Sequence, residues 1–235
     1  MFTNSEVSVD AITVKKIAMS LGADLCGIAP ADRFEGAPKG HHPKDIYPEC
    51  RSVIVFAKRM PAGLLDAKSC VPYTQVSHII NQELDKLGIS LGLALEDLGA
   101  RAVPLPADDP YEHWEADRQY GRAVLSMRHA GYLAGLGLMG RNTLLKNDRY
   151  GNMIKLGAIL VDADIEPDPI ATYAGCPERC RRCLDACPAK ALDGTAVDQK
   201  LCRPVSGFTN EKGFFLMRCN TCRSVCPQRL GIKKR

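Results

Sequence analysis

The distribution of the 11 cysteines constrains this chain more than any other feature. Three of them, Cys26, Cys50 and Cys70, are scattered, whereas eight lie between Cys176 and Cys226. Thiols in the cytosol stay reduced, so a dense group of this kind indicates a metal-binding module rather than a disulfide scaffold. With 235 residues, the chain is long enough for one large globular domain followed by such a module.

The eight clustered cysteines have the spacing of a two-cluster ferredoxin. CPERCRRCLDACP and CNTCRSVCP both end in C-x2-C-x3-C-P, and in bacterial ferredoxins the last cysteine of such a run ligates the other cluster. The first interval has three residues instead of two, and Cys202 supplies the early ligand that the second run lacks. Crossed ligation predicts one 4Fe-4S cluster on Cys176, Cys180, Cys183 and Cys226, and a second on Cys187, Cys202, Cys219 and Cys222. Two zinc sites and a set of disulfides are the alternatives, although zinc does not require the paired endings and disulfides do not suit a reducing compartment.

The residues before these cysteines show alternating helical and strand patterns. Helices are expected over 10–22, 76–98 and 122–134, and strands over 26–30, 52–57, 102–105 and 155–162. The pattern breaks in EPDPIATYAGCPE, which places a boundary near Pro167. The sequence therefore predicts a mixed α/β (α+β) domain over 1–166 and a cysteine module over 167–235.

Charge and hydropathy give expectations about the partners and the cellular location of the protein. The formal charge of +4 indicates an acidic partner, but eight thiolates and two cores of about +2 each bring the total near zero. The arginines among the cysteines then balance the clusters, and a solvated basic face is the alternative. The start MFTNSEVSVD lacks the features of a leader peptide, and no apolar run reaches the roughly 18 residues of a membrane span. We therefore expect a cytoplasmic protein that does not interact with a membrane.

A glycine-rich segment precedes the last predicted strand. Gly135, Gly137 and Gly140 spell G-x-G-x-x-G, the dinucleotide fingerprint, which requires a strand before the glycines and a helix after them. Here RAVLSMRHAGYLA before the glycines has helical composition, and RNTLLKNDRYGN after them is polar. The context therefore disfavours a dinucleotide site.

Three features of the chain point to a known family: AGLGLMGRNTLL, YGNMIKLGAILVDADIE and the double cysteine motif. Together they resemble the cobalamin-dependent epoxyqueuosine reductases and the related respiratory reductive dehalogenases. GADLCGIAPADRF and PECRSVIVFA resemble the start of the same family, so the resemblance covers nearly the whole chain. It implies a nitroreductase-like, cobalamin-binding α/β domain followed by a ferredoxin-like two-cluster module that reduces the cobalt.

The resemblance also implies site residues. The family's corrinoid-contacting segment falls on Gly135, Leu136, Gly137, Gly140, Arg141, Asn142 and Thr143. Glycines suit this role because they let backbone approach a flat macrocycle, and a tight turn without a ligand is the alternative.

The family's proton-donating aspartate aligns with Gly121, and its usual glutamate aligns with Met127, while Arg128 is retained. Asp117 and Tyr120 are the nearest candidates for a general acid, although a surface segment would contain such residues as well.

The function implied by the resemblance is that of an iron-sulfur oxidoreductase. Two 4Fe-4S clusters would pass electrons from a donor such as ferredoxin or flavodoxin to a corrinoid cobalt, which would reduce a small-molecule substrate. The alternatives are an electron-transfer protein that has lost the corrinoid and a reductive activator of a corrinoid protein partner. The chain ends nine residues after Cys226, without the helical-repeat tail of larger family members, so we expect tRNA to be an unlikely partner.

Overall fold

The computed structural model describes residues 9–117 and 120–232. Its first part is built on an antiparallel sheet with the strand order β1-β2-β8-β3. These strands are β1 (Leu25–Pro30), β2 (Ser52–Arg59), β8 (Ile154–Val161) and β3 (Ala102–Leu105). The continuous apolar runs of β2 and β8 occupy the centre of the sheet, where both faces are covered.

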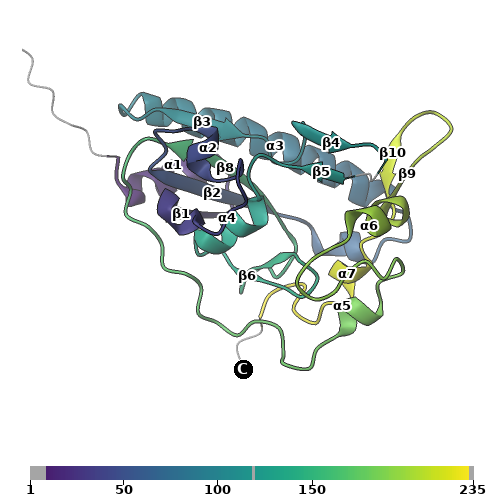
Figure 1. Cartoon of the computed structure of the whole chain (residues 1–235). Coiled ribbons are helices and arrows are strands. Elements are labelled where there is room, and N and C mark those ends of the chain that lie inside the picture. Colours follow the sequence, from purple (N-terminus) through teal and green to yellow (C-terminus); the bar gives the residue numbers. More distant parts are fainter. Residues whose placement is uncertain (1–8, 118–119, 233–235) are drawn as a thin grey trace, which may run out of the picture.

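Helices cover the two faces of the sheet (Figure 1). Helices α1 (Ala11–Ser20) and α3 (Val71–Glu96) pack on one face, and α4 (Met127–Leu133) packs on the other. Because successive side chains of a strand point to opposite faces, Phe56 belongs to the α1/α3 core and Val55 to the α4 core. We call residues 9–117 and 120–166 the sheet domain, and it therefore has two continuous apolar cores, one on each side of the sheet.

Most of the predicted elements are present, with shifted ends. The strand over 102–105 has the predicted bounds, and α1 begins after Asp10, whose side chain accepts a hydrogen bond from the Thr13 N–H. Helix α3 begins five residues before the predicted start, because Pro72 fits the first turn of a helix. It ends before Gly99, which adopts a φ of +91°.

The helix predicted over 122–134 is wrong in its first part. Strand β5 (Tyr120–Arg122) pairs with β4 (His113–Glu115) in a hairpin, and the helix begins only at Met127. Arg203 stacks over Tyr111 and Trp114 next to this hairpin, and Leu125 is buried in the α4 core. These contacts come from distant parts of the chain, which explains why local periodicity missed the hairpin.

Shorter elements complete the sheet domain. They are helix α2 (Pro43–Ile46), the 3-10 helices η1 (Ala31–Phe34) and η2 (Ala62–Leu65), and the hairpin strands β6 (Leu138–Met139) and β7 (Leu145–Lys146). In the described ranges, no helix combines the length and the apolar character needed to cross a membrane.

The cysteine module follows a long extended linker. It contains α5 (Arg182–Asp185), α6 (Gln199–Ser206), the hairpin of β9 (Gly207–Thr209) and β10 (Phe215–Met217), and α7 (Thr221–Ser224). The linker still contacts the sheet domain at Asp168, whose carboxylate accepts the Ile28 N–H at 2.9 Å and pairs with Lys15. The module packs near the start of α3, where the Met217 N–H donates to Thr74 Oγ1 (Figure 1).

Candidate functional site

The first quartet, which we define as Cys176, Cys180, Cys183 and Cys226, comes together beside α5. All four side chains line one small cavity between the loop before α5 and the turn after α7. Burial raises the pKa of Cys183, and Cys176, Cys226 and Cys180 raise it further. Four thiolates at this spacing repel one another, so their deprotonated form needs a cationic core.

The second quartet, which we define as Cys187, Cys202, Cys219 and Cys222, draws on three helices: Cys187 follows α5, Cys202 lies in α6, and Cys219 and Cys222 lie at or in α7. Burial raises the pKa of Cys222 to about 11, and the other three cysteines add to the rise. The cysteine neighbours of Cys183, Cys226, Cys202 and Cys222 fall into the two sets that crossed ligation predicts. The ligand roles themselves stay predictions.

The donor chemistry of both quartets fits iron-sulfur clusters. Within the described residues, no three or more His, Cys, Asp or Glu side chains converge closely enough to hold a single metal ion. A 4Fe-4S cluster makes a different demand, because each thiolate binds its own iron on the surface of a larger core. Two backbone groups also point at sulfur: the Arg141 N–H lies 3.5 Å from Cys176 Sγ, and the Ala191 N–H lies 3.4 Å from Cys187 Sγ. Hydrogen bonds of this kind tune the reduction potential of a cluster.

Two of the three scattered cysteines, Cys26 and Cys50, have no cysteine of either quartet among their electrostatic neighbours. All 11 cysteines are free thiols. Burial raises the pKa of Cys26 to about 12 and that of Cys50 to about 11, and neither has another cysteine among its electrostatic neighbours. Both thiols are therefore poor nucleophiles and act as packing residues.

The glycines of the G-x-G-x-x-G segment serve close backbone packing. Gly135 has a φ of +74°, and a Cβ there would lie 2.3 Å from the Pro169 carbonyl oxygen. A Cβ on Gly137 would lie 2.4 Å from the carbonyl oxygen of Lys146, across the β6–β7 hairpin. The segment follows α4 and leads into a two-residue strand, which differs from the strand-turn-helix that a dinucleotide site requires.

The polar residues after these glycines join the sheet domain to both quartets. The Arg141 guanidinium donates to the Cys180 carbonyl at 2.9 Å and to the Glu178 carbonyl, and Asn142 Nδ2 donates to the Cys222 carbonyl at 2.9 Å. Thr143 accepts two hydrogen bonds from Arg128. None of the seven residues predicted to contact a corrinoid, all of which the structure describes, lines the large cavity described next. Their corrinoid contacts stay a prediction.

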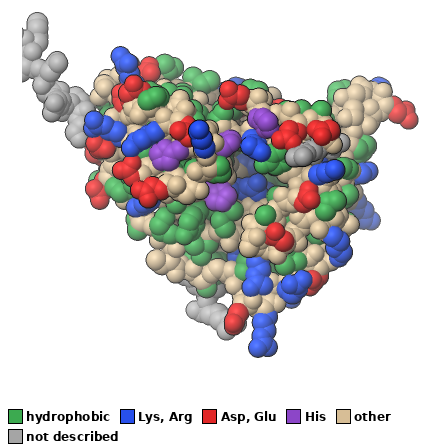
Figure 2. Space-filling model, viewed as in Figure 1, with side chains coloured by type: hydrophobic (Ala, Val, Ile, Leu, Met, Phe, Trp, Pro, Cys, Tyr) green, Lys and Arg blue, Asp and Glu red, His purple; other side chains and the backbone are tan. Residues whose placement is uncertain are grey.

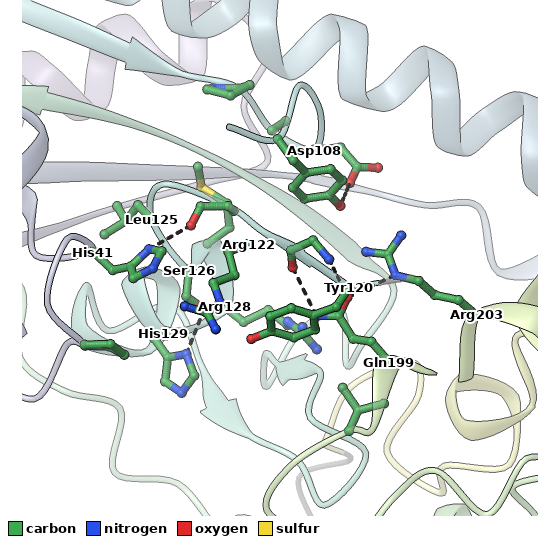
Figure 3. A pocket seen from close by; sticks show the side chains of 18 of the residues that line it. His41, Asp108, Tyr120, Arg122, Leu125, Ser126, Arg128, His129, Gln199 and Arg203 are labelled. Atoms are coloured by element: carbon green, nitrogen blue, oxygen red, sulfur yellow. Dashed lines mark hydrogen bonds between the residues drawn. The ribbon is translucent and has the colours of Figure 1, made fainter. Parts of the chain in front are cut away.

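A large cavity of about 820 Å³ lies between the sheet domain and the cysteine module. Figure 2 shows histidine and basic side chains gathered around a hollow on the face that contains it. Its wall includes Asp108, Tyr120 and Arg128 from the sheet domain, and Cys202 and Arg203 from the module (Figure 3). The volume is in the upper part of the range for cofactor sites, and a cysteine of the second quartet borders it.

The structure separates the two candidate general acids. Tyr120 is half-buried and lines the large cavity together with Gly121, whereas Asp117 is exposed and does not line it. The Arg122 guanidinium lies 5.2 Å from the centre of the Tyr120 ring. Of the two candidates, only Tyr120 is therefore placed to reach a molecule in the cavity.

Sequence reasoning missed two residues of the cavity wall, Asp108 and Tyr111. The Tyr111 hydroxyl donates to Asp108 Oδ1 at 3.2 Å, and Asn81 Nδ2 donates to Asp108 Oδ2 at 2.9 Å. Burial raises the pKa of Tyr111, and the Asp108 carboxylate adds to the rise. No periodic pattern in PADDPYEHW marks these two residues, and their contacts with Asn81 and Arg203 come from distant parts of the chain.

Basic and imidazole groups line the opposite wall. Desolvation lowers the pKa of Arg128, and Arg223 lowers it further. His41 Nδ1 lies 3.0 Å from the Ala123 carbonyl, and His129 Nδ1 lies 2.7 Å from Ser126 Oγ. Burial lowers the pKa of His129, and Arg128 adds to the effect. Both histidines line the cavity, as Figure 3 shows.

Comparison with known proteins identifies relatives along most of the chain. No protein-family model matches it. The epoxyqueuosine reductase of Gloeobacter violaceus is 34% identical over 269 residues, which cover 95% of this chain and 77% of that relative. The epoxyqueuosine reductase of Staphylococcus aureus is 28% identical over 261 residues, which cover 92% of this chain. The chain spans only 63% of the length of that second relative.

Two solved structures share the mixed α/β fold. A reductive dehalogenase, whose structure suggests a mechanism for B12-dependent dehalogenation, superimposes with a TM-score of 0.64 over 92% of this chain and 31% of its own, at 19% identity. An epoxyqueuosine reductase with an epoxyqueuosine-modified tRNA-Tyr stem loop superimposes with a TM-score of 0.60 over 92% of this chain and 64% of its own, at 20% identity. This second structure contradicts the expectation that tRNA is an unlikely partner. That expectation was wrong because it relied on where the chain ends, whereas the relative that carries tRNA shares the fold described above.

Proposed function

The chain belongs to the epoxyqueuosine reductase family, and from this premise we propose that it is an iron-sulfur oxidoreductase with two 4Fe-4S clusters and a corrinoid. The nitroreductase-like character of residues 1–166 and the ferredoxin-like character of residues 167–235 are part of this proposal. One observation supports it most: Cys202 of the second quartet borders the large cavity. A group held in that cavity would lie next to an electron source.

The cavity walls suggest which residues would hold a corrinoid. Arg128 and Arg203 offer cationic and planar groups, and Leu125 and Met127 offer apolar contact. When bound, the corrinoid would supply a redox-active cobalt for reduction of the substrate. The segment from Gly135 to Thr143 does not line this cavity. Its Arg141 and Asn142 would support the site indirectly, because they hydrogen-bond the backbone of both quartets and hold them against the sheet domain.

A reductase also needs a proton donor. Tyr120 is the proposed donor, because it lines the cavity while Asp117 is exposed outside it. The hydrogen-bonded pair of Tyr111 and Asp108 would orient the facing wall. For the substrate we propose an epoxide carried on tRNA, since the relatives are named for epoxyqueuosine and one carries a modified tRNA stem loop.

The proposal is tested by anaerobic reconstitution with iron and sulfide, followed by titration with hydroxocobalamin. We expect about eight irons per chain and a cobalamin absorption spectrum that saturates at one equivalent. Full clusters with an unchanged cobalamin spectrum would favour an electron-transfer protein that has lost the corrinoid. Weak binding that strengthens only with a corrinoid protein present would favour a reductive activator.

A further inference from the structure

Lys146 is a charged side chain in an unusually closed setting. It ends β7, and its residue is only 1% exposed. Its ammonium donates to Gln228 Oε1 at 2.6 Å, and Gln228 Nε2 donates to the Gly175 carbonyl at 3.2 Å. Across the described residues, no carboxylate forms an ion pair with Lys146, so a neutral amide is its hydrogen-bond partner. Burying an ammonium in this way is costly unless an anion lies nearby.

The position of Lys146 indicates that the nearby anion is the first quartet with its thiolates. Gln228 follows Cys226 by two residues, and Gly175 directly precedes Cys176. The hydrogen bonds of Lys146 and Gln228 therefore join the two chain segments that supply this quartet. Burial raises the pKa of Cys226, and Lys146 is one of the groups that oppose the rise.

The second quartet also has a buried cation beside it, Arg223, which corresponds to Lys146 beside the first quartet. Arg223 directly follows Cys222 and is 8% exposed, and its Nη1 has no hydrogen-bond partner among the described residues. Arg223 opposes the rise in the pKa of Cys222, as Lys146 does for Cys226. Each quartet thus has one buried cation beside it that forms no ion pair with a carboxylate of residues 9–117 or 120–232.

Resting on the proposed iron-sulfur function, we propose that Lys146 is the built-in countercharge of the first cluster and sets its reduction potential. Four thiolates around a core of about +2 leave a net charge of about −2, and reduction adds one electron and one further negative charge. A fixed ammonium nearby stabilises the reduced cluster more than the oxidised one. Lys146 neither gains nor loses a proton in this step and acts as a positioning residue through its charge.

The test compares Lys146→Gln with Lys155→Gln. Lys155 is a matched control, because its ammonium also donates to a side-chain amide, Asn81 Oδ1 at 2.9 Å, and its electrostatic neighbours are Asp108 and Arg223 rather than a cysteine. Both cluster potentials are measured by anaerobic redox titration followed by electron paramagnetic resonance. In Lys146→Gln we expect one potential to fall by the equivalent of about a tenfold change in equilibrium constant, about 59 mV for a one-electron couple. Lys155→Gln leaves that potential unchanged.

Each outcome decides a separate point. Full clusters with both potentials unchanged in Lys146→Gln would overturn this inference and leave the proposed function intact. A wild-type protein that assembles no clusters would overturn the proposed function and this inference with it. If Lys146→Gln fails to assemble clusters, Gln228→Glu provides the second variant, since it keeps the ammonium and neutralises it with a carboxylate. It should lower the same potential, and an unchanged potential there would refute the role of Lys146.

Discussion

The sheet domain and the cysteine module have different kinds of interior. In the sheet domain, two continuous apolar cores cover both faces of the sheet, with Phe56 and Leu91 almost completely buried. In the module, the buried apolar residues are Cys183, Leu184, Cys187, Ala191 and Cys226, three of which are proposed cluster ligands. Helices α5 and α7 have four residues each, too few to be stable alone.

This difference indicates what each region needs in order to fold. The sheet domain has two continuous apolar cores of its own, and it supplies most of the wall of the large cavity. Over its described residues, which run up to 232, the module has no such core, and it exposes Phe214 and Phe215 on its hairpin. We therefore expect its fold to depend on the proposed clusters, as in other small domains whose metal-binding free energy is also folding free energy. The predictions that follow test this contrast.

The largest expected effect comes from removing the iron. A chelator, or the Cys222→Ser substitution for the second cluster alone, should destroy the fold of the module while the sheet domain persists. Hydrogen exchange would show this as lost protection over 176–226 and retained protection in β2 and β8. Equal protection of the module with and without iron would contradict the contrast between the two regions.

The Phe56→Ala substitution tests the sheet domain. Phe56 is 1% exposed in the α1/α3 core, so its truncation should cost about 3–5 kcal/mol of the free energy of unfolding. Folded molecules should keep their full iron content, because no cysteine of either quartet belongs to this core. The matched control is Leu93→Ala, whose side chain is exposed on α3 and whose loss should change the free energy by about 0.5 kcal/mol or less. Thermal melts with iron analysis measure both quantities.

The contacts between the regions should have an intermediate effect. Asn142 is 3% exposed and donates to the Cys222 carbonyl, so Asn142→Ala leaves a partly buried acceptor without this partner, at a cost of about 1–3 kcal/mol. We expect faster iron loss from the second cluster than from the first in a chelator competition assay. Asn210→Ala, in the β9–β10 turn, provides a control for the side-chain change. Identical iron-loss rates in Asn142→Ala and wild type would show that the hydrogen bond from Asn142 to the Cys222 carbonyl does not stabilise the module.

The smallest expected effect concerns pH. Burial and Arg128 lower the pKa of His129 in the folded state, so its neutral form is favoured there. The stability linked to this residue is therefore present above the unfolded pKa and is lost as pH falls through that value towards the folded pKa. His129→Gln should flatten the slope of the free energy of unfolding between about pH 7 and 5. Denaturant titrations at several pH values measure it, and an unchanged slope would place His129 outside the titrating groups of the cavity wall.

The sequence was most informative where a local pattern determines the structure. The apolar runs of β2 and β8 and the stripe of α3 are such patterns. The cysteine spacing is another local pattern, and the two ligand sets that it predicts stay a prediction. Residues whose role depends on distant partners were missed. Lys146 is buried because Gln228 reaches it from 82 positions away, and Asp108 lines the cavity beside Asn81 of α3. Polar partners at such separations leave no periodic signal in a single sequence.

The most direct test of the account is a measurement of cobalt and cluster together. Anaerobic protein with both clusters is mixed with one equivalent of cobalamin, and the cobalt paramagnetic resonance signal is recorded before and after stepwise reduction of the clusters. The account predicts a cobalt signal that differs from that of free cobalamin and changes again when the cluster beside the large cavity is reduced, because Cys202 borders that cavity. A fully loaded protein whose cobalt signal matches free cobalamin in every redox state would contradict it.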